Sequence, residues 1–295
     1  SEYVWEEMTY LPGLLRWYRP SDYDVTVTCS YPYVNWFLRA RGGRRRPSHV
    51  FVTQNGVWPV VSDDAEFRWF GADGIVCTNP MFERECRLCT DVSVATIPNG
   101  VDIRNFTPGP GDRTRFGLPA DRPVVLMASA LIPTKRVDVA VRAVARCPGV
   151  VLAVAGDGPD RALVESLAAE ALPDRFVRLS LPPEEMPELY RCADAFVHLS
   201  LEEAFGNVYI EAAACGTPVI AHDNEGTRWI LGDDATLLDT TDELRLSEAI
   251  SRVVADGRSS VQERSVESVR DRFSWDVVAA GYERLLDTVV KGHRR

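Results

Sequence analysis

The sequence lacks several features that would place it in a simple class. Lysine and arginine number 33 against 43 acidic residues, a formal net charge of −10, so the clustered cationic excess of a general nucleic-acid binder is missing. The longest apolar run, from Pro123 to Pro133, is far shorter than the ~20 residues that cross a bilayer. The first residues are acidic where a signal peptide is cationic. We therefore expect neither a nucleic-acid partner, nor a membrane span, nor a leader.

Cysteine is too scattered for a disulfide framework. The seven cysteines are odd in number and mostly stand singly in apolar segments, which predicts reduced thiols and a cytoplasmic location. Cys86 and Cys89 have the spacing of a redox or metal pair, but no second pair or histidine follows nearby. A structural interpretation is therefore favoured over metal binding, and we expect no metal site.

What is present is the composition of a globular protein, with 45% hydrophobic and 26% charged residues over 295 positions. This length corresponds to about two domains. After Pro123, short apolar runs alternate with amphipathic segments, which is typical of a parallel sheet covered on both faces. The predicted strands of this half are 124–128, 150–155, 176–179, 195–199 and 218–221, and the predicted helices are 135–147, 160–171, 184–190 and 206–215.

The first hundred residues repeat this alternation more briefly. Turn-forming clusters from Pro98 to Asp102 and from Pro108 to Gly111 mark a linker. The sequence therefore predicts an α/β fold with two Rossmann-like, doubly wound domains, residues 1–105 with a returning helix over 274–291, and residues 106–273. The predicted strands of the first domain are 24–29, 49–53, 74–77 and 92–97, and its predicted helices are 34–40, 64–70 and 81–89, with a helix or loop over 3–19.

The segment from Leu199 to Ala221 carries the clearest chemistry. A strand ends in a polar loop, Gly206 lets the backbone approach a ligand, and a helix begins whose first N–H groups are unpaired. Such a helix start suits a diphosphate. Glu203 and Glu211 lie near it, and because carboxylates repel phosphate, we expect them to accept hydrogen bonds from sugar hydroxyls. Solvated surface glutamates are the simpler alternative.

This pattern resembles the retaining glycosyltransferases of family 4, which have the GT-B architecture. Their donor domain carries two glutamates at this spacing, followed by a Gly-Thr-Pro-Val turn like the one that begins at Gly216. Three further matches are Pro-Asn-Gly-Val-Asp from position 98, Gly-Asp-Gly-Pro from position 156 and Phe-Ser-Trp from position 273. The resemblance covers most of the chain from Asp24 to Val290.

The resemblance implies roles for individual residues and an activity without a metal or other cofactor. Lys135 would neutralise the departing diphosphate, since a fixed cation stabilises the charge that develops there. Glu203 would contact the donor sugar, and Glu211 the nucleotide ribose. The backbone of Phe205, Gly206 and Asn207 would hold the diphosphate, and that of Leu181 the base.

The sequence departs from the family in three places. The family arginine that grips the diphosphate is replaced by Ala130, and Arg136 is the candidate to supply the missing cation. Asn55 stands where the family has a histidine near the donor sugar, and it can hydrogen-bond but cannot carry a positive charge. The strand, Gly-rich loop and helix that open GT-B acceptor domains have no counterpart before Asp24, so the first domain is expected to be incomplete at its start.

The sequence thus predicts transfer of a sugar from a UDP- or GDP-sugar to an acceptor hydroxyl with retention, the acceptor being a glycan, a lipid-linked molecule or a small molecule. The alternative is a degenerate protein that binds a nucleotide sugar without transferring it. A dinucleotide-dependent oxidoreductase is disfavoured because no G-x-G-x-x-G follows a strand. An arginine-rich loop is interpreted as solvated, or alternatively as a contact for anionic lipids on the inner face of a membrane; its residues are Arg39, Arg41, Arg44, Arg45 and Arg46.

Overall fold

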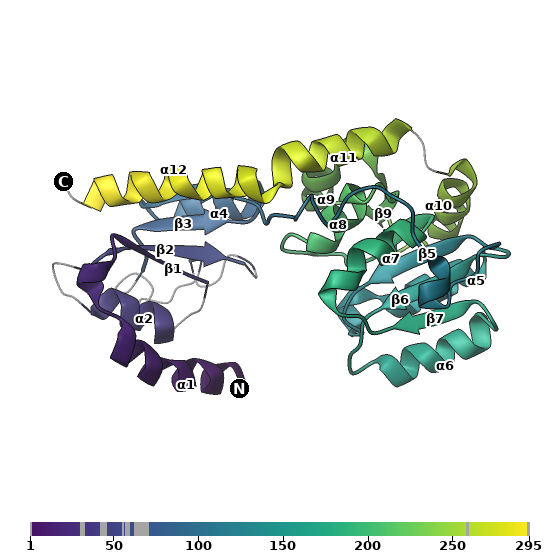
Figure 1. Ribbon diagram of the computed structural model, residues 1–295, viewed down its shortest axis with the longest axis horizontal. Coiled ribbons are helices and arrows are strands. Elements are labelled where there is room, and N and C mark those ends of the chain that lie inside the picture. Colours follow the sequence, from purple (N-terminus) through teal and green to yellow (C-terminus); the bar gives the residue numbers. More distant parts are fainter. Residues whose placement is uncertain are drawn as a thin grey trace. The chain divides into compact units, whose positions relative to one another are not determined.

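The protein is described by a computed structural model that covers residues 2–29, 33–41, 46–54, 56, 60–61, 71–257 and 260–293, with side chains except at 2–8, 260–262 and 293. The chain divides into two compact units (Figure 1). Unit 1 comprises residues 1–99 and 276–295, and unit 2 comprises residues 100–275. The first boundary falls in the turn-rich linker that the sequence indicates, and the second lies at the start of the last helix.

Unit 1 contains a four-stranded parallel sheet. Its strands are β1 (Val25–Thr28), β2 (Ser48–Thr53), β3 (Gly74–Cys77) and β4 (Ser93–Thr96), in the spatial order β1-β2-β3-β4. All residues of β2 and β3 are buried, because alternate side chains enter the cores on opposite faces of the sheet. The order advances in one direction only, so the described part of this sheet has no reversal of winding.

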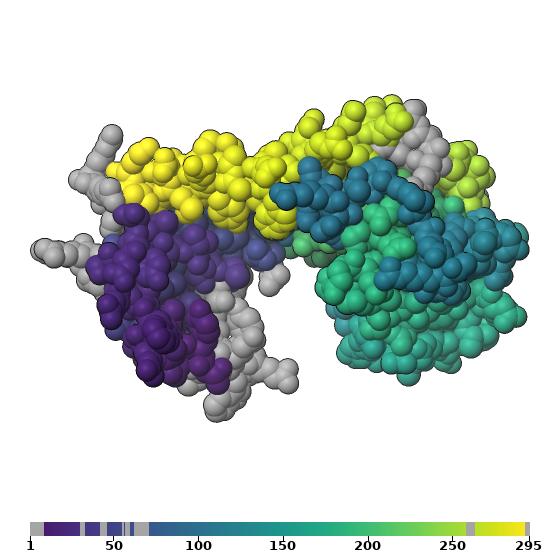
Figure 2. Space-filling model, viewed as in Figure 1, coloured from purple at the N-terminus to yellow at the C-terminus, as the bar shows by residue number. Residues whose placement is uncertain are grey.

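Helices cover both faces of this sheet. On one face, Val50, Val52 and Val76 pack against Leu285 and Val289 of α12 (Trp275–His293). The opposite side of α12 faces solvent (Figure 2). On the other face, Phe51 and Ile75 share a core with Cys86 of α4 (Pro80–Cys89). The remaining described helices of the unit are α1 (Glu2–Trp17) and α2 (Tyr33–Ala40).

Unit 2 contains a six-stranded parallel sheet in the order β10-β9-β8-β5-β6-β7. The chain builds outward from β5 through β6 to β7, then returns to the other side of β5 to add β8, β9 and β10. The winding therefore reverses between β5 and β8, which are adjacent and paired in parallel. The strands are β5 (Val124–Ala128), β6 (Val151–Ala155), β7 (Phe176–Leu179), β8 (Ala195–His198), β9 (Val219–His222) and β10 (Thr236–Leu238).

Helices lie on both sides of this sheet, and a buried apolar core occupies each face. Alternate residues of β5 again divide between them: Val124 and Leu126 belong to one core, Val125 and Met127 to the other. The helices are α5 (Val137–Ala145), α6 (Arg161–Ala171), α7 (Met186–Cys192), α8 (Asn207–Ala214), α9 (Glu225–Leu231), α10 (Glu243–Asp256) and α11 (Ser260–Phe273).

Three expectations need correction or completion. The helix expected from Lys135 to Cys147 is shorter, because Pro133–Lys135 forms a 3-10 turn and Arg136 adopts a positive φ of 55° before α5 begins. Strand β10 and helices α9 to α11 were not expected. The helix expected over 64–70 lies outside the described residues. None of the helices in the described ranges is long and apolar enough to cross a membrane.

Candidate functional site

The loops that leave β5 and β8 define the candidate site. In an open parallel sheet, ligands bind beyond the carboxyl ends of the strands at the point where the winding reverses. In unit 2 this point lies between β5 and β8. Lys135 belongs to the loop after β5, and Glu203 and Gly206 belong to the loop after β8. The topology therefore brings together residues that are 68 positions or more apart in the sequence.

The two loops are joined by an ion pair. The Lys135 Nζ lies 2.6 Å from Oε2 of Glu203, and each side chain is 22% exposed. The 3-10 turn that holds Lys135 is closed by a hydrogen bond from its backbone N–H to the Ile132 carbonyl, 3.1 Å long. Lys135 and Glu203, for which the resemblance implies contacts with the diphosphate and the donor sugar, thus lie in contact, with room for solvent or a ligand to reach them.

A buried histidine completes the surroundings of Glu203. Nε2 of His198 lies 3.1 Å from the same Oε2 and 3.1 Å from Oγ of Ser200. Burial by itself raises the pKa of Glu203, but hydrogen bonds from His198 and Lys135, with the charge of Lys135, outweigh it and lower the pKa to about 2. Glu203 is therefore a carboxylate near neutral pH.

Gly206 shapes the start of α8. Its φ is 77°, a left-handed conformation that favours glycine, and it forms the N-cap of the helix. A Cβ at this position would lie only 2.5 Å from the ring of Tyr209 and 3.0 Å from Cγ of Glu203. The backbone at Gly206 therefore lies closer to the side chains of Tyr209 and Glu203 than a residue with a Cβ would allow. Phe205 is buried against Trp229 and Phe273, whereas Asn207 is exposed.

Glu211 lies in a different environment from Glu203. It is in α8, and its Oε2 accepts a hydrogen bond of 2.8 Å from the hydroxyl of Tyr190. Burial raises the pKa of Glu211, while the hydrogen bond from Tyr190 opposes the rise. No cation is among the groups that shift this pKa. The role of Glu211 toward a ribose stays a prediction.

Arg136 is engaged by the protein itself. Its guanidinium donates to the Leu199 carbonyl at 3.1 Å and to the Oγ1 and carbonyl oxygens of Thr240 at 2.9 and 3.0 Å. These bonds tie the loop after β5 to β8 and to the end of β10. A diphosphate would have to compete with these hydrogen bonds for the guanidinium.

Two further residues were predicted to contact the donor. Leu181 is partly buried against the core around β8 and α8, and Asn55 lies outside the described residues.

The structure describes part of two sequence features of unit 1, the arginine-rich segment and the Cys86–Cys89 pair. Arg39 lies at the end of α2 and not in the loop that the sequence predicts. Arg39 and Arg46 both bind the carboxylate of Asp73, at 2.7 and 2.8 Å, so these two charges are paired within the protein. Arg44 and Arg45 lie outside the described residues. None of the seven cysteines, all of which are described, forms a disulfide; Cys86 is buried and Cys89 is exposed. In the described part of the chain, no three His, Cys, Asp or Glu side chains form a group that could hold a metal ion.

Two residues of the site were not singled out from the sequence. His198 ends β8 and Tyr190 lies in α7, and each contacts one of the two glutamates. The sequence did contain a signal for His198, because a histidine in an apolar strand, directly before a polar loop, is expected to be buried and to need a hydrogen-bond partner. No comparable signal marks Tyr190, because its contact with Glu211 depends on how α7 packs against α8.

Comparison with known proteins decides the family. Residues 111–272 match the family described as glycosyl transferases group 1. The chain belongs to this family. The matching region contains every described residue of the site around Lys135, Glu203 and Glu211, and it lies within unit 2.

Two curated proteins with different names are similar to this chain. The lipopolysaccharide core biosynthesis glycosyltransferase LpsE of Rhizobium meliloti is 34% identical over 193 residues, 62% of this chain and 56% of that protein. The D-inositol 3-phosphate glycosyltransferase of Mycolicibacterium smegmatis is 35% identical over 224 residues, 68% of this chain and 50% of that protein. The chain thus spans about half the length of these curated relatives.

Solved structures share the fold. A sucrose-phosphate synthase from Thermosynechococcus elongatus superposes with a TM-score of 0.81 at 25% identity, over 96% of this chain and 77% of that one. HepE from Anabaena, solved in complex with UDP-glucose, gives a TM-score of 0.76 at 19% identity, over 92% and 80% of the two chains. The architecture expected from the sequence, two parallel α/β sheets of the GT-B type, is confirmed.

Proposed function

We propose that this chain binds a nucleotide-diphosphate sugar in unit 2 and transfers the sugar to an acceptor hydroxyl. The observation that carries the proposal is the Lys135–Glu203 pair at the reversal of the sheet. A lysine and a carboxylate in contact there offer one group for a diphosphate and one for sugar hydroxyls. Family membership supports the reaction class.

Each group has a task in this proposal. Lys135 binds the diphosphate and stabilises the negative charge that grows on it as the glycosyl bond breaks. The first backbone N–H groups of α8, beside Gly206, hold the same diphosphate. Glu203 accepts hydrogen bonds from the sugar, Glu211 from the ribose, and the backbone at Leu181 contacts the base. The acceptor attacks from the face that the diphosphate leaves, so the configuration is retained and no metal is needed.

The donor is proposed to carry uridine or guanosine. A UDP-sugar is the first to test, because a structural neighbour was solved with UDP-glucose. The acceptor is proposed to be a hydroxyl of a glycan, a lipid-linked molecule or a small molecule. The names of the two curated relatives, which refer to lipopolysaccharide core biosynthesis and to an inositol phosphate, support this range of acceptors.

The experiment combines binding with turnover. Calorimetry measures affinity for UDP, UDP-glucose and GDP-mannose, and release of UDP or GDP measures donor hydrolysis and transfer, with and without EDTA. We expect Lys135→Ala to lower turnover at least ~100-fold, since one transition-state donor contributes on that scale, and EDTA to leave the rate unchanged. Wild-type rates in Lys135→Ala and in Glu211→Ala would refute the proposal.

A second candidate is a protein that binds the donor without transferring the sugar. The observation in its favour is that Ala130 replaces the family arginine while the guanidinium of Arg136 is bonded to Thr240 and Leu199. Donor binding with neither hydrolysis nor transfer, over a panel of acceptors, would favour this candidate.

A further inference from the structure

The carboxylate of Glu203 receives two hydrogen bonds on one oxygen. Both Lys135 and His198 approach Oε2, at 2.6 and 3.1 Å. A carboxylate only accepts hydrogen bonds, so the ring proton of His198 must be on Nε2. Among the described residues, Oε1 receives no bond from the protein, so it is the oxygen available to a ligand.

The two donors differ in freedom to move. His198 is 2% exposed and lies in β8, with its ring 5.0 Å from that of Tyr209 at an edge-on angle of 87° and 6.5 Å from that of Phe196, nearly parallel. Lys135 is 22% exposed and carries its charge on a flexible four-carbon stem. Packing therefore fixes the histidine, whereas the lysine can change partner.

A bound diphosphate would compete with Glu203 for Lys135. The diphosphate carries more negative charge than one carboxylate, so it attracts Lys135 away from Glu203. Glu203 would then lie near the diphosphate without its cation, and repulsion would push it out of place. A hydrogen bond from a side chain that stays in position prevents this.

Resting on the proposed function, we propose that His198 is a positioning residue that holds the Glu203 carboxylate in place while Lys135 turns from Glu203 to the donor's diphosphate. The free protein is then in a resting state in which Lys135 and Glu203 neutralise each other. Donor binding exchanges this ion pair for two separate contacts, Lys135 with the diphosphate and Glu203 with the sugar.

The first experiment uses the free protein. The carboxyl carbon of Glu203 is titrated by NMR in the wild type, in Lys135→Met and in Lys135→Met/His198→Leu. The ionisable groups that face Glu203 are Lys135, His198 and Tyr209. With Lys135 removed, we expect His198 to keep the pKa of Glu203 lower than in the double variant by about one unit or more. Equal values in the two variants would overturn the proposal.

The second experiment uses the donor. Calorimetry measures UDP and UDP-glucose binding to the wild type, His198→Leu, His198→Gln and Phe196→Leu. We expect His198→Leu to weaken UDP-glucose binding about tenfold while UDP affinity stays within about twofold, and His198→Gln, which keeps an N–H donor, to recover most of the loss. Phe196→Leu is the control for disturbed packing of β8, since Phe196 contacts the ring of His198 but not Glu203.

The outcomes separate the two proposals. If His198→Leu weakens UDP and UDP-glucose alike, or if Phe196→Leu reproduces its effect, His198 acts only through the fold and the inference is wrong. If the wild type binds no UDP- or GDP-linked ligand, the proposed function fails and the donor exchange fails with it. The NMR titration still decides in that case whether His198 holds Glu203.

Discussion

The two glutamates of unit 2 show how neighbours decide what a carboxylate does. Glu203 has a lysine and a histidine N–H beside it, and these outweigh burial and lower its pKa to about 2. Glu211 is buried beside a neutral tyrosine hydroxyl, and burial raises its pKa. The same residue type, eight positions apart, is thus held ionised in one case and made costly to ionise in the other.

The contributions of Glu203 and Glu211 to the free energy of unfolding change with pH in opposite directions. Because the folded-state pKa of Glu203 is lowered, its contribution is present above its unfolded pKa and is lost as the pH falls toward 2. In Glu203→Gln we expect the free energy of unfolding to vary less with pH than in the wild type. It should be lower than in the wild type by on the order of 2 kcal/mol at pH 7, and this difference should vanish near pH 2. Urea unfolding followed by circular dichroism, at several pH values, measures it.

Glu211→Gln is the matched comparison. The folded-state pKa of Glu211 is raised, so its ionisation reduces stability as the pH rises through that value. Relative to the wild type, Glu211→Gln should therefore gain stability with rising pH, the reverse of Glu203→Gln. The same direction in both variants would contradict the assigned surroundings.

At the scale of elements, the start of α8 depends on one glycine. Gly206→Ala would place a methyl group 2.5 Å from the Tyr209 ring at a φ of 77°. We expect a loss of about 2 kcal/mol, from left-handed strain and overpacking together, with weaker donor binding. Gly117→Ala is the matched control, since Gly117 has a φ of 64° and nothing within 4 Å of the added carbon. Equal losses in the two variants would show that the contact with Tyr209 does not matter.

The elements of unit 1 are tied by Asp73, which accepts hydrogen bonds from Arg39 at the end of α2, from Arg46 and from the backbone N–H of His49 in β2. Burial raises the pKa of Asp73, but the arginines and this N–H outweigh it and lower the pKa to about 2. Asp73→Asn leaves two arginines without their anion, so we expect it to cost about 3 kcal/mol. Hydrogen exchange in β2 and β3 measures the loss, and Asp91→Asn, at an exposed bend before β4, should leave exchange unchanged.

How far the sequence predicts these elements depends on whether their cause is local. Strands β5 and β7 were predicted to the residue, because continuous apolar runs bounded by polar turns are a local signal. Strand β10 was missed, since three half-buried residues at a sheet edge carry little pattern. The contacts of Arg136 and Asp73 depend on partners far along the chain, so no local pattern specifies them. The contact of His198 is with Glu203, five positions later, and it depends on how the loop after β8 folds.

At the scale of the whole molecule, the described sheets of the two units differ in how they are wound. The sheet of unit 2 winds both ways from β5, and its outer strands are β10 and β7. The sheet of unit 1 begins at β1, which pairs only with β2 among the described strands. Val27 of β1 is 45% exposed. The other edge of β1 has no partner among the described strands.

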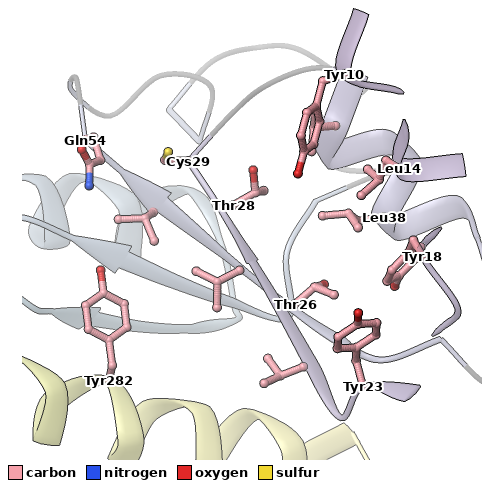
Figure 3. Close-up of a pocket in the computed structure, with 14 residues that line it drawn as sticks. Tyr10, Leu14, Tyr18, Tyr23, Thr26, Thr28, Cys29, Leu38, Gln54 and Tyr282 are labelled. Carbon is pink, nitrogen blue, oxygen red and sulfur yellow. The ribbon is translucent and has the colours of Figure 1, made fainter. Parts of the chain in front are cut away.

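This edge opens into a cavity of about 840 Å³. Figure 3 shows Tyr10, Leu14 and Leu38 on one side of β1 and Tyr282 of α12 on the other. Because open apolar grooves bind amphipathic dyes, we expect the folded chain to enhance the fluorescence of anilinonaphthalene sulfonate. Val27→Lys should reduce the enhancement by about half or more, without changing the far-ultraviolet circular dichroism. Leu88→Lys is the control, since Leu88 is 84% exposed on α4 and does not line the cavity; equal enhancement in the two variants would place the dye elsewhere.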